Sequence, residues 1–206
     1  MGQIRKVAII GGNRIPFTRS NTAYSHASNM DMLSAALQGL VQRFNLQGER
    51  LGEVAAGAVM KHSRDFNLAR EATLNSGLAL ETPAYDVQQA CGTGLEAAIL
   101  VANKIALGQI DAGIAGGTDT TSDAPLALNE NFRKMMLDLS RAKTLGQRLK
   151  ILGRFRPGFL MPMPPAAGEP RTGLSMGQHC ELMAKEWAIS REAQDELTWH
   201  SHQNLM

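Results

Sequence analysis

The sequence predicts an α/β fold with a mostly parallel sheet, followed by a mainly helical second part. Residues 1–122 alternate between short apolar runs of strand length and longer segments with apolar residues at helical spacing. Such alternation is typical of parallel sheets covered by helices. After residue 122 the amino-acid composition changes, and basic residues, methionine and proline become frequent. We therefore expect a core over 1–122 and a helical loop domain over 123–206.

The composition is that of a globular protein. Of the 206 residues, 44% are hydrophobic and 19% are charged, and the formal net charge of +2 makes no general case for a nucleic-acid partner. The two cysteines, Cys91 and Cys180, make no disulfide framework. No apolar run approaches the about 18 residues that a membrane span needs, and the N-terminus does not read as a signal peptide. We expect a cytoplasmic protein.

Seven alternating elements are expected in the core, beginning and ending with a strand. The first strand is the apolar run Val7–Ile10, and the Gly11-Gly12 that follows lacks the third glycine of a dinucleotide-binding loop. The long polar loop over 13–29 is of the kind that often serves a function. The later elements are expected as a helix over 30–44 capped by Ser28 or Asn29, a strand over 54–60, a helix over 67–76 stopped by Gly77, a strand around Tyr85, a helix after Cys91 and a strand around Ile114.

The turn around Cys91 joins a predicted strand to a predicted helix. Gly92 and Gly94 permit a tight reversal of the backbone, and Gly108 suits a left-handed helix stop. The helix carries one apolar face, made of Leu95, Ala98, Ile99, Ala102, Ile105 and Ala106.

This position suits a nucleophile. A helix N-terminus stabilises negative charge, such as that of a thiolate, by about 0.3–1 kcal/mol, and its N–H groups stabilise a substrate oxyanion. Cys91 is therefore interpreted either as a nucleophile or as a small buried hydrophobe, the commoner fate of a cysteine.

Two short basic helices, broken near residues 144–146, are expected in the second part. From Arg133 to Arg156 the chain carries eight basic residues and one acidic residue, Asp138, so the local charge is +7. Methionine and leucine interleave with these charges at roughly helical spacing. The pattern fits a solvated hairpin packed on the core. It also fits a surface for anionic lipid, for coenzyme A phosphates or for a partner subunit.

The last part predicts a loop and two helices. Residues 157–170 are rich in proline, methionine and glycine, which predicts a loop. A helix over 175–189 places Cys180 on an apolar stripe, so we expect this thiol in the core. Ser190 is expected to cap a final helix. His200 and His202 of that helix do not share a face, so no metal site is expected.

Three stretches resemble thiolases. Gln89-Ala-Cys-Gly-Thr-Gly-Leu95 and Ala112-Gly-Ile-Ala-Gly-Gly-Thr-Asp-Thr-Thr-Ser-Asp-Ala-Pro125 are similar to the acyl-accepting half of a thiolase. Gly12–Arg19 resembles the thiolase N-terminal strand and loop, and the insertion over 132–159 resembles thiolase subunits of fatty-acid-oxidation multienzyme complexes. The resemblance covers essentially the whole chain. It implies the first βαβαβαβ half of the layered thiolase fold plus the loop domain, with the Cys91 helix in the middle layer.

The resemblance also implies a reaction. A thiolase cleaves a 3-ketoacyl-CoA with coenzyme A to acetyl-CoA and a shortened acyl-CoA in β-oxidation, or runs the reverse condensation. Cys91 would accept the acyl group, and Met176 would lie near the pantetheine and acyl pocket. Coenzyme A would be a substrate, with no cofactor bound permanently. The implied partners are acyl-CoA substrates, further copies of the chain, a hydratase–dehydrogenase subunit and anionic lipid at 133–156.

Several points depart from the family pattern. Thr93 replaces the serine of the common Cys-Gly-Ser-Gly, and residues 118–121 differ from the usual segment, which leaves substrate detail open. The Asn-Glu-Ala, Gly-His-Pro and Cys-x-Gly segments of thiolases do not occur in the 206 residues. We therefore expect an N-terminal portion that does not catalyse thiolysis by itself. The alternatives are a biosynthetic acetoacetyl-CoA thiolase, a decarboxylating condensing enzyme of the same fold, a non-catalytic lipid-transfer or scaffold module, and a cysteine hydrolase.

Overall fold

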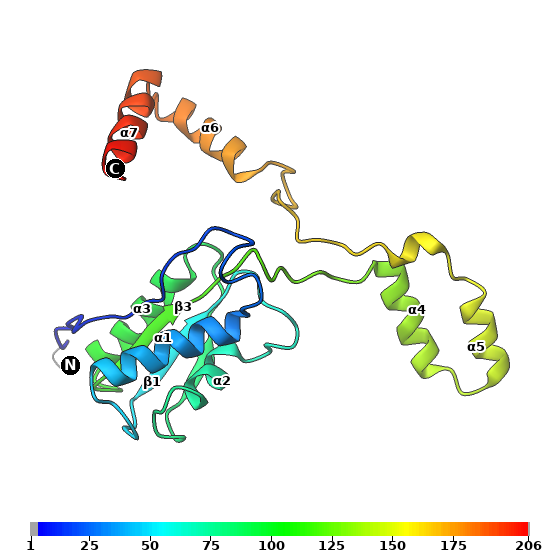
Figure 1. Cartoon of the computed structure of the whole chain (residues 1–206), viewed down its shortest axis with the longest axis horizontal. Helices are drawn as coiled ribbons and strands as arrows, with labels where there is room; N and C mark the ends of the chain where they lie inside the picture. Colours follow the sequence, from blue (N-terminus) through cyan, green and yellow to red (C-terminus); the bar gives the residue numbers. More distant parts are fainter. Residues whose placement is uncertain (1–3, 206) are drawn as a thin grey trace. The chain divides into compact units, whose positions relative to one another are not determined.

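The structure, a computed structural model, describes residues 4–205 (Figure 1). It contains two compact units that meet in sequence between Pro164 and Pro165. The boundary predicted between 122 and 123 lies inside the first unit. There, Ala127 and Met163 exchange two backbone hydrogen bonds, of 2.9 and 2.8 Å, which close the base of the segment between them.

Three parallel strands form the sheet of the first unit. Their order is β2-β1-β3, with β1 in the centre and all of its residues buried. Val54 stands opposite Ala84 on one side and Ile114 on the other. The strands are β1 (Glu53–Gly57), β2 (Ala84–Asp86) and β3 (Gly113–Gly117).

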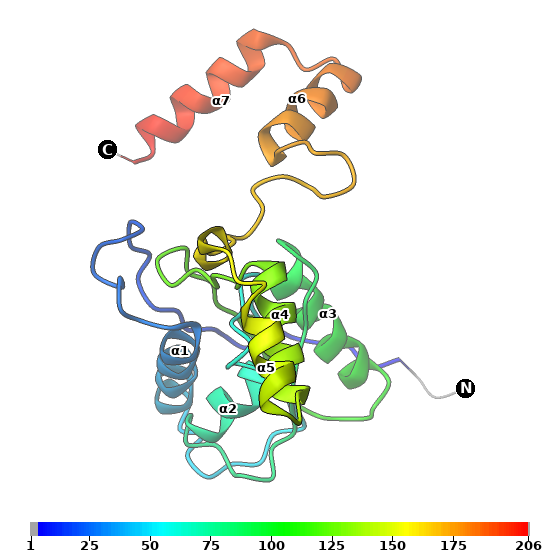
Figure 2. The same ribbon diagram turned by 90° about the vertical axis from the view of Figure 1, so that its right-hand side faces the viewer.

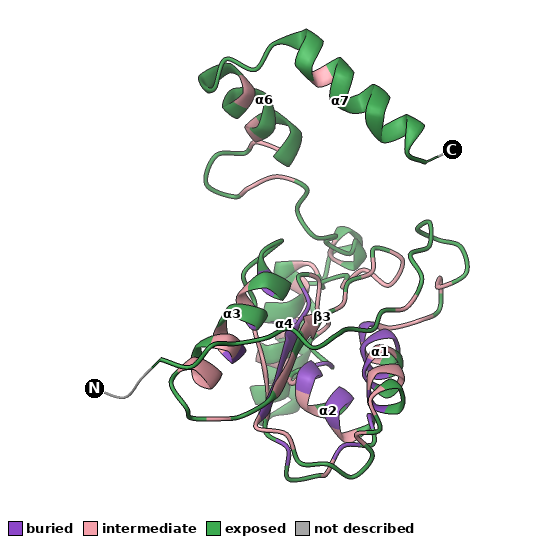
Figure 3. Cartoon of the chain, turned by 90° about the vertical axis from the view of Figure 1, so that its left-hand side faces the viewer, coloured by how far each residue is buried: buried purple, intermediate pink, exposed green. Residues whose placement is uncertain are grey.

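Helices cover both faces of this sheet (Figure 2). On one face, α1 (Asn29–Arg43) and α2 (Leu68–Leu74) pack on Val54 and Ala56 of β1. On the other face, α3 (Thr93–Ala106) packs on Ala55. Figure 3 shows the buried residues gathered in the central strand and on the sides of α1 and α2 that meet it. The predicted α/β class is confirmed, because alternate residues of one strand serve two separate helix layers.

Local signals set the ends of these helices as predicted. The Ser28 side chain accepts a hydrogen bond from the Asp31 N–H, and the Asp31 carboxylate accepts one from the Ser28 N–H, forming a capping box. Gly77 and Gly108, with φ of +94° and +71°, follow α2 and α3 in the left-handed region.

The predicted first strand over 7–10 is wrong. Ile9 and Ile10 are 96% and 85% exposed, and residues 4–12 pair with no strand in the described structure. One backbone contact of this segment is the Arg5 N–H to the Ala106 carbonyl, at 3.0 Å. An apolar run indicates that a segment favours burial, but a strand also requires a neighbouring backbone that supplies hydrogen bonds. The observed order is therefore α1-β1-α2-β2-α3-β3.

The predicted apolar face of α3 is only partly right. The residues buried in this helix are Thr93, Ala97 and Val101, whereas Leu95 and Ile99 are 70% and 44% exposed. This helix is apolar around most of its circumference, so periodicity does not decide which face meets the sheet.

The two predicted basic helices are confirmed as α4 (Glu130–Arg141) and α5 (Leu145–Leu152), which we call the basic hairpin together with the residues up to Arg156. Thr144 caps α5 with a second capping box, which explains the break. Phe155 stacks edge-on against Phe132 and Phe159, and Phe159 lies in a 3-10 turn over Pro157–Leu160 inside the predicted loop.

The second unit consists of α6 (Met176–Glu186) and α7 (Arg191–Gln203), capped by Ser175 and Ser190. The predicted core position of Cys180 is wrong, because this thiol is exposed. Within residues 165–205 no side chain is buried, so the apolar stripe of α6 has no covering element in its own unit. In the described part of the chain, each helix falls short of the length and hydropathy needed to span a bilayer.

Candidate active site around Cys91

Cys91 lies in the turn that leads from β2 into α3, and its side chain is exposed. Gly92 is the N-cap of α3, so the thiol stands immediately before the helix begins. The predicted strand–turn–helix arrangement is thus observed. Ligands of open parallel sheets bind beyond the carboxyl ends of the strands, which is where this turn lies. The first N–H groups of a helix have no partner inside the helix and favour negative charge nearby.

The backbone of this turn is strained. Ala90, directly before Cys91, has a φ of +44°, in the left-handed region that alanine seldom adopts. Such a conformation costs about 1–3 kcal/mol and persists only where neighbouring contacts hold it. Two backbone hydrogen bonds contribute: the Gly92 N–H donates to the Gln89 carbonyl at 2.9 Å, and the Thr93 N–H donates to the Ala90 carbonyl at 3.1 Å.

Thr93 adds two side-chain hydrogen bonds across the same turn. Its hydroxyl accepts from the Gln89 N–H at 2.9 Å and donates to the Ala90 carbonyl at 2.7 Å. The side chain is 5% exposed. Thr93 was noted from the sequence only as the residue that replaces the serine of Cys-Gly-Ser-Gly, and these bonds were not predicted. Serine and threonine side chains often hydrogen bond to backbone groups three or four residues earlier, so a threonine at the start of the predicted helix could have indicated these bonds.

The loops beyond β1 and β3 are tied together by Asp119. Its carboxylate accepts the N–H groups of Val59 and Met60, both at 2.9 Å. The Gln88 side chain donates to the Val59 carbonyl at 3.3 Å, which links the loop after β2 to the same point. The loops at the carboxyl edge of the sheet are therefore held to one another, although no sequence motif indicated it.

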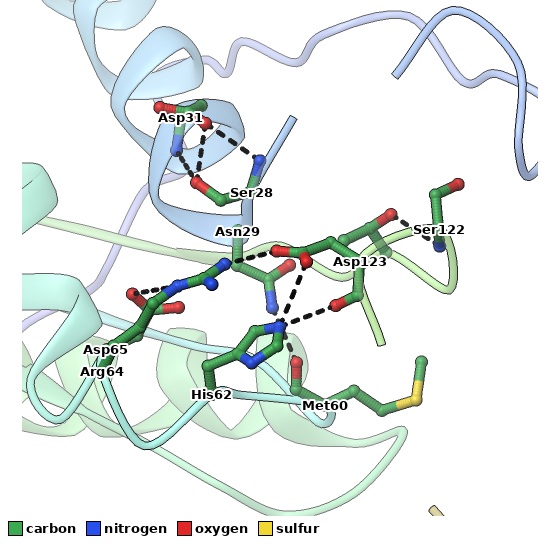
Figure 4. A network of polar contacts seen from close by, with 10 residues as sticks. Ser28, Asn29, Asp31, Met60, His62, Arg64, Asp65, Ser122 and Asp123 are labelled. Atoms are coloured by element: carbon green, nitrogen blue, oxygen red, sulfur yellow. Dashed lines mark hydrogen bonds and ion pairs between the residues drawn. The ribbon is translucent and has the colours of Figure 1, made fainter. Parts of the chain in front are cut away.

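A polar network joins the start of α1 to these loops (Figure 4). His62 Nε2 lies 3.0 Å from the Asp123 carbonyl and 3.3 Å from its carboxylate, which also accepts from Arg64 at 2.6 Å. Asn29 donates to the Met60 carbonyl at 2.7 Å. His62 is thus engaged by Asp123. Within residues 4–205, no histidine makes a hydrogen bond to the Cys91 thiol.

Two carboxylates anchor the strands that lead to the turn. Asp86, at the end of β2, accepts the N–H groups of Leu68 and Ala69 at the start of α2, at 3.2 and 2.7 Å, and pairs with Lys61. Carboxylates are favourable at a helix N-terminus. Asp86 therefore fixes α2 to the end of the strand that precedes Cys91.

Glu53, at the start of β1, is buried and pairs with Lys104 of α3. The Tyr85 hydroxyl donates to Glu53 at 3.2 Å, and the Lys104 ammonium lies 4.9 Å from the centre of the Tyr85 ring. Burial raises the pKa of Tyr85, and the Glu53 charge raises it further. The hydrogen bond to Glu53 raises the pKa of Lys104.

The long polar loop borders a cavity of about 440 Å³ together with residues 117–122. The hydroxyls of Ser20 and Thr121 lie 2.8 Å apart, and the Asn21 N–H donates to the Ser122 hydroxyl at 2.8 Å. These bonds hold the loop against the segment after β3.

Met176, the other predicted site residue, is the first residue of α6 and is 60% exposed. It belongs to the second compact unit, whereas Cys91 belongs to the first. In residues 4–205 no three side chains of the types His, Cys, Asp and Glu cluster so as to hold a metal ion.

Comparison with known proteins identifies the family. Residues 7–206 match the family described as thiolase, N-terminal domain. The chain belongs to the thiolase family. The sequence of the chain is 41% identical over 197 residues to the 3-ketoacyl-CoA thiolase of Vibrio cholerae serotype O1, covering 96% of the chain and 45% of that protein. It is 40% identical over 199 residues to the mitochondrial trifunctional enzyme subunit beta of Mus musculus, covering 97% of the chain and 42% of that protein.

The fold of the thiolase chain is similar to that of a solved structure, the Bacillus anthracis acetyl-CoA acetyltransferase. The TM-score is 0.69 at 23% identity, over 93% of this chain and 43% of that one. The predicted thiolase resemblance and layered fold class are thereby confirmed. The chain spans less than half the length of the curated relatives named above.

Proposed function

We propose that this thiolase cleaves 3-ketoacyl-CoA with coenzyme A in fatty-acid β-oxidation, giving acetyl-CoA and a shortened acyl-CoA, with Cys91 as the nucleophile. The observation that carries this proposal is the position of an exposed thiol at the start of α3, on a strained turn. Two relatives support the substrate class, because one is named 3-ketoacyl-CoA thiolase and another trifunctional enzyme subunit beta.

The reaction has two acyl transfers. The Cys91 thiolate attacks the 3-keto carbon, and the carbonyl oxygen becomes an oxyanion. The bond between carbons 2 and 3 then breaks, its electron pair leaves on carbon 2 of acetyl-CoA, and a proton joins that carbon. The acyl group remains on sulfur as a thioester. The thiol of coenzyme A loses its proton, attacks this thioester and restores the Cys91 thiolate.

The chain's own contribution is the nucleophile and its immediate surroundings. The N–H groups at the start of α3 favour the thiolate, and we assign the Cys91 backbone N–H to the oxyanion. In the described structure, Thr93 is the only residue whose side chain hydrogen bonds at this turn. We assign the proton transfers of the reaction to groups outside the turn.

The remaining assignments follow the family. Met176 contacts the pantetheine and acyl portion of the substrate. Coenzyme A is a substrate, and no cofactor is held permanently. The protein is cytoplasmic, forms homo-oligomers and associates with a hydratase–dehydrogenase subunit, as the trifunctional name of one relative suggests. The basic hairpin contacts anionic lipid, since its residues 133–156 carry a local charge of +7 and Leu145 and Leu149 on α5 are 74% and 60% exposed.

Competitive alkylation tests the nucleophile. Both thiols are exposed, so Cys180 serves as the control for accessibility within the same molecule. With limiting iodoacetamide and peptide mass spectrometry, Cys91 should label at least about tenfold faster than Cys180. Incubation with acetyl-CoA should place an acetyl group on the Cys91 peptide. Equal labelling of the two cysteines, or faster labelling of Cys180, would show that Cys91 is not an activated thiol.

A further inference from the structure

We propose that Thr93 is the positioning residue of the nucleophile: its hydroxyl holds the turn in the form that presents Cys91 at the start of α3. This inference rests on the proposed role of Cys91. It assigns a task to a residue whose hydroxyl hydrogen bonds to the backbone of the turn.

The hydroxyl bonds to both sides of the strained residue. The Thr93 hydroxyl accepts from the N–H of Gln89, the residue before Ala90, at 2.9 Å, and it donates to the Ala90 carbonyl at 2.7 Å. Cys91 follows at once. If Ala90 relaxed from its φ of +44° to the ordinary negative region, the chain direction at Cys91 would change, and the sulfur would leave the helix N-terminus.

Other contacts at the turn do not replace this one. The two backbone hydrogen bonds of the turn do not involve the side chain at position 93. Within the described residues, Thr93 is the only residue whose side chain hydrogen bonds to the backbone of 89–91. Its hydroxyl is therefore the side-chain group that distinguishes this turn from a generic one.

The methyl group of Thr93 packs against the end of β1. A β-carbon built on Gly57, at the end of β1, would stand 2.8 Å from Thr93 Cγ2, so the methyl group contacts the sheet. The side chain is 5% exposed, which restricts its rotation. Because the methyl group packs on the sheet while the hydroxyl bonds to the turn, the two functions can be separated by substitution. Thr93→Val keeps the shape and removes the hydroxyl. Thr93→Ser keeps the hydroxyl and removes the methyl group.

The experiment compares alkylation rates of Cys91 and Cys180 in the 206-residue chain and its variants, with iodoacetamide as the probe. Thr93→Val should slow Cys91 by about tenfold, because two hydrogen bonds of the turn are lost. It should leave Cys180 unchanged. Thr93→Ser should keep the Cys91 rate within about twofold of the parent. If Thr93 only stabilised the fold, the serine variant, which loses the methyl group that contacts the sheet, should also slow Cys91. The expected pattern is different, because only the valine variant should slow it.

A second variant keeps the test decisive. Ala90→Gly removes the penalty of the left-handed conformation, so in the Thr93→Val background it should restore most of the Cys91 rate. Circular dichroism of each variant reports whether it is folded. An unchanged Cys91 rate in folded Thr93→Val would overturn the positioning role. If Thr93→Val does not fold, the double variant decides: a slow Cys91 in that folded protein overturns the role.

The two proposals fail differently. A parent protein in which Cys91 reacts no faster than Cys180 overturns the nucleophile itself. A parent with a fast Cys91 that is insensitive to Thr93→Val retains the nucleophile and overturns only the positioning by Thr93.

Discussion

Gly57 and Val87 approach so closely that a β-carbon built on Gly57 would stand 1.9 Å from the Val87 carbonyl oxygen. The contact joins the end of the central strand to the segment that leads into the Cys91 turn. Only a residue without a side chain permits it.

Gly57→Ala should therefore destabilise the fold by about 1–3 kcal/mol, because the new methyl group collides with backbone that cannot move without breaking the sheet. Urea denaturation measures this free energy of unfolding. Gly116→Ala is the matched control, since a β-carbon there meets no atom within 4 Å. We expect the control to change stability by less than about 0.5 kcal/mol. Equal stability of the two variants would show that the close approach is not a constraint.

The Tyr85 hydroxyl should ionise above pH 10, since burial and the Glu53 charge both raise its pKa. The chain has two tyrosines, so a Tyr24→Phe background leaves the phenolate absorbance to Tyr85 alone. Glu53→Gln should lower the titration midpoint, because it removes the neighbouring negative charge. A midpoint at or below pH 10, or one that Glu53→Gln does not move, would contradict the observed network.

Stability should fall at alkaline pH. The pKa values of Lys104 and Tyr85 are both raised by folding, so each group binds its proton more tightly in the folded chain. Their contribution is complete below the ordinary values of about 10 and is lost as the pH rises through the folded values. Thermal unfolding from pH 8 to 11 measures the loss. In the double variant Lys104→Met/Tyr85→Phe the slope above pH 10 should become shallower, and an unchanged slope would place the effect elsewhere.

Asp86→Asn should destabilise the chain by about 1–3 kcal/mol, because it weakens two hydrogen bonds at the start of α2 and leaves Lys61 without its charged partner. Hydrogen exchange of the Leu68 and Ala69 amides should accelerate in the same variant. Asp111→Asn is the control, since that side chain is 92% exposed. Its effect should stay below about 1 kcal/mol. Protected Leu68 and Ala69 amides in Asp86→Asn would show that another group caps α2.

Binding of the chain to phosphatidylserine vesicles should weaken steeply as salt rises, because exposed charges are screened within about 10 Å at 0.1 M. Lys143→Gln combined with Lys150→Gln should reduce binding by at least about tenfold. Lys185→Gln, on α6 and 70% exposed, should change it little. Salt-independent binding, or equal loss in the Lys185 variant, would remove the basic hairpin as the lipid contact.

The sequence predicted what local chemistry determines. The caps Ser28 and Ser190 were identifiable because a hydroxyl before an amphipathic run satisfies N–H groups at the start of a helix. The strand–turn–helix at Cys91 was recognisable from its glycines and its apolar helix. Those signals depend on neighbours in sequence.

Features that depend on distant residues were not predictable. The run over 7–10 looked like a central strand, yet pairing depends on which strand edge is accessible, and no local pattern encodes that. Cys180 looked like a core thiol, although burial needs a covering element. Asp119 reaches Val59 across 60 residues of sequence, and its role became visible only once the sheet had brought the loops together.

The two backbone hydrogen bonds between Ala127 and Met163 make the intervening segment a closed insertion. Hydrogen bonds of 2.9 and 2.8 Å hold its two ends side by side, so the segment begins and ends at one place on the chain. A short turn could replace the basic hairpin without moving the flanking residues, and a different hairpin could be grafted in its place. Surface specificity can thus diverge at this position while the Cys91 turn remains under its own constraints.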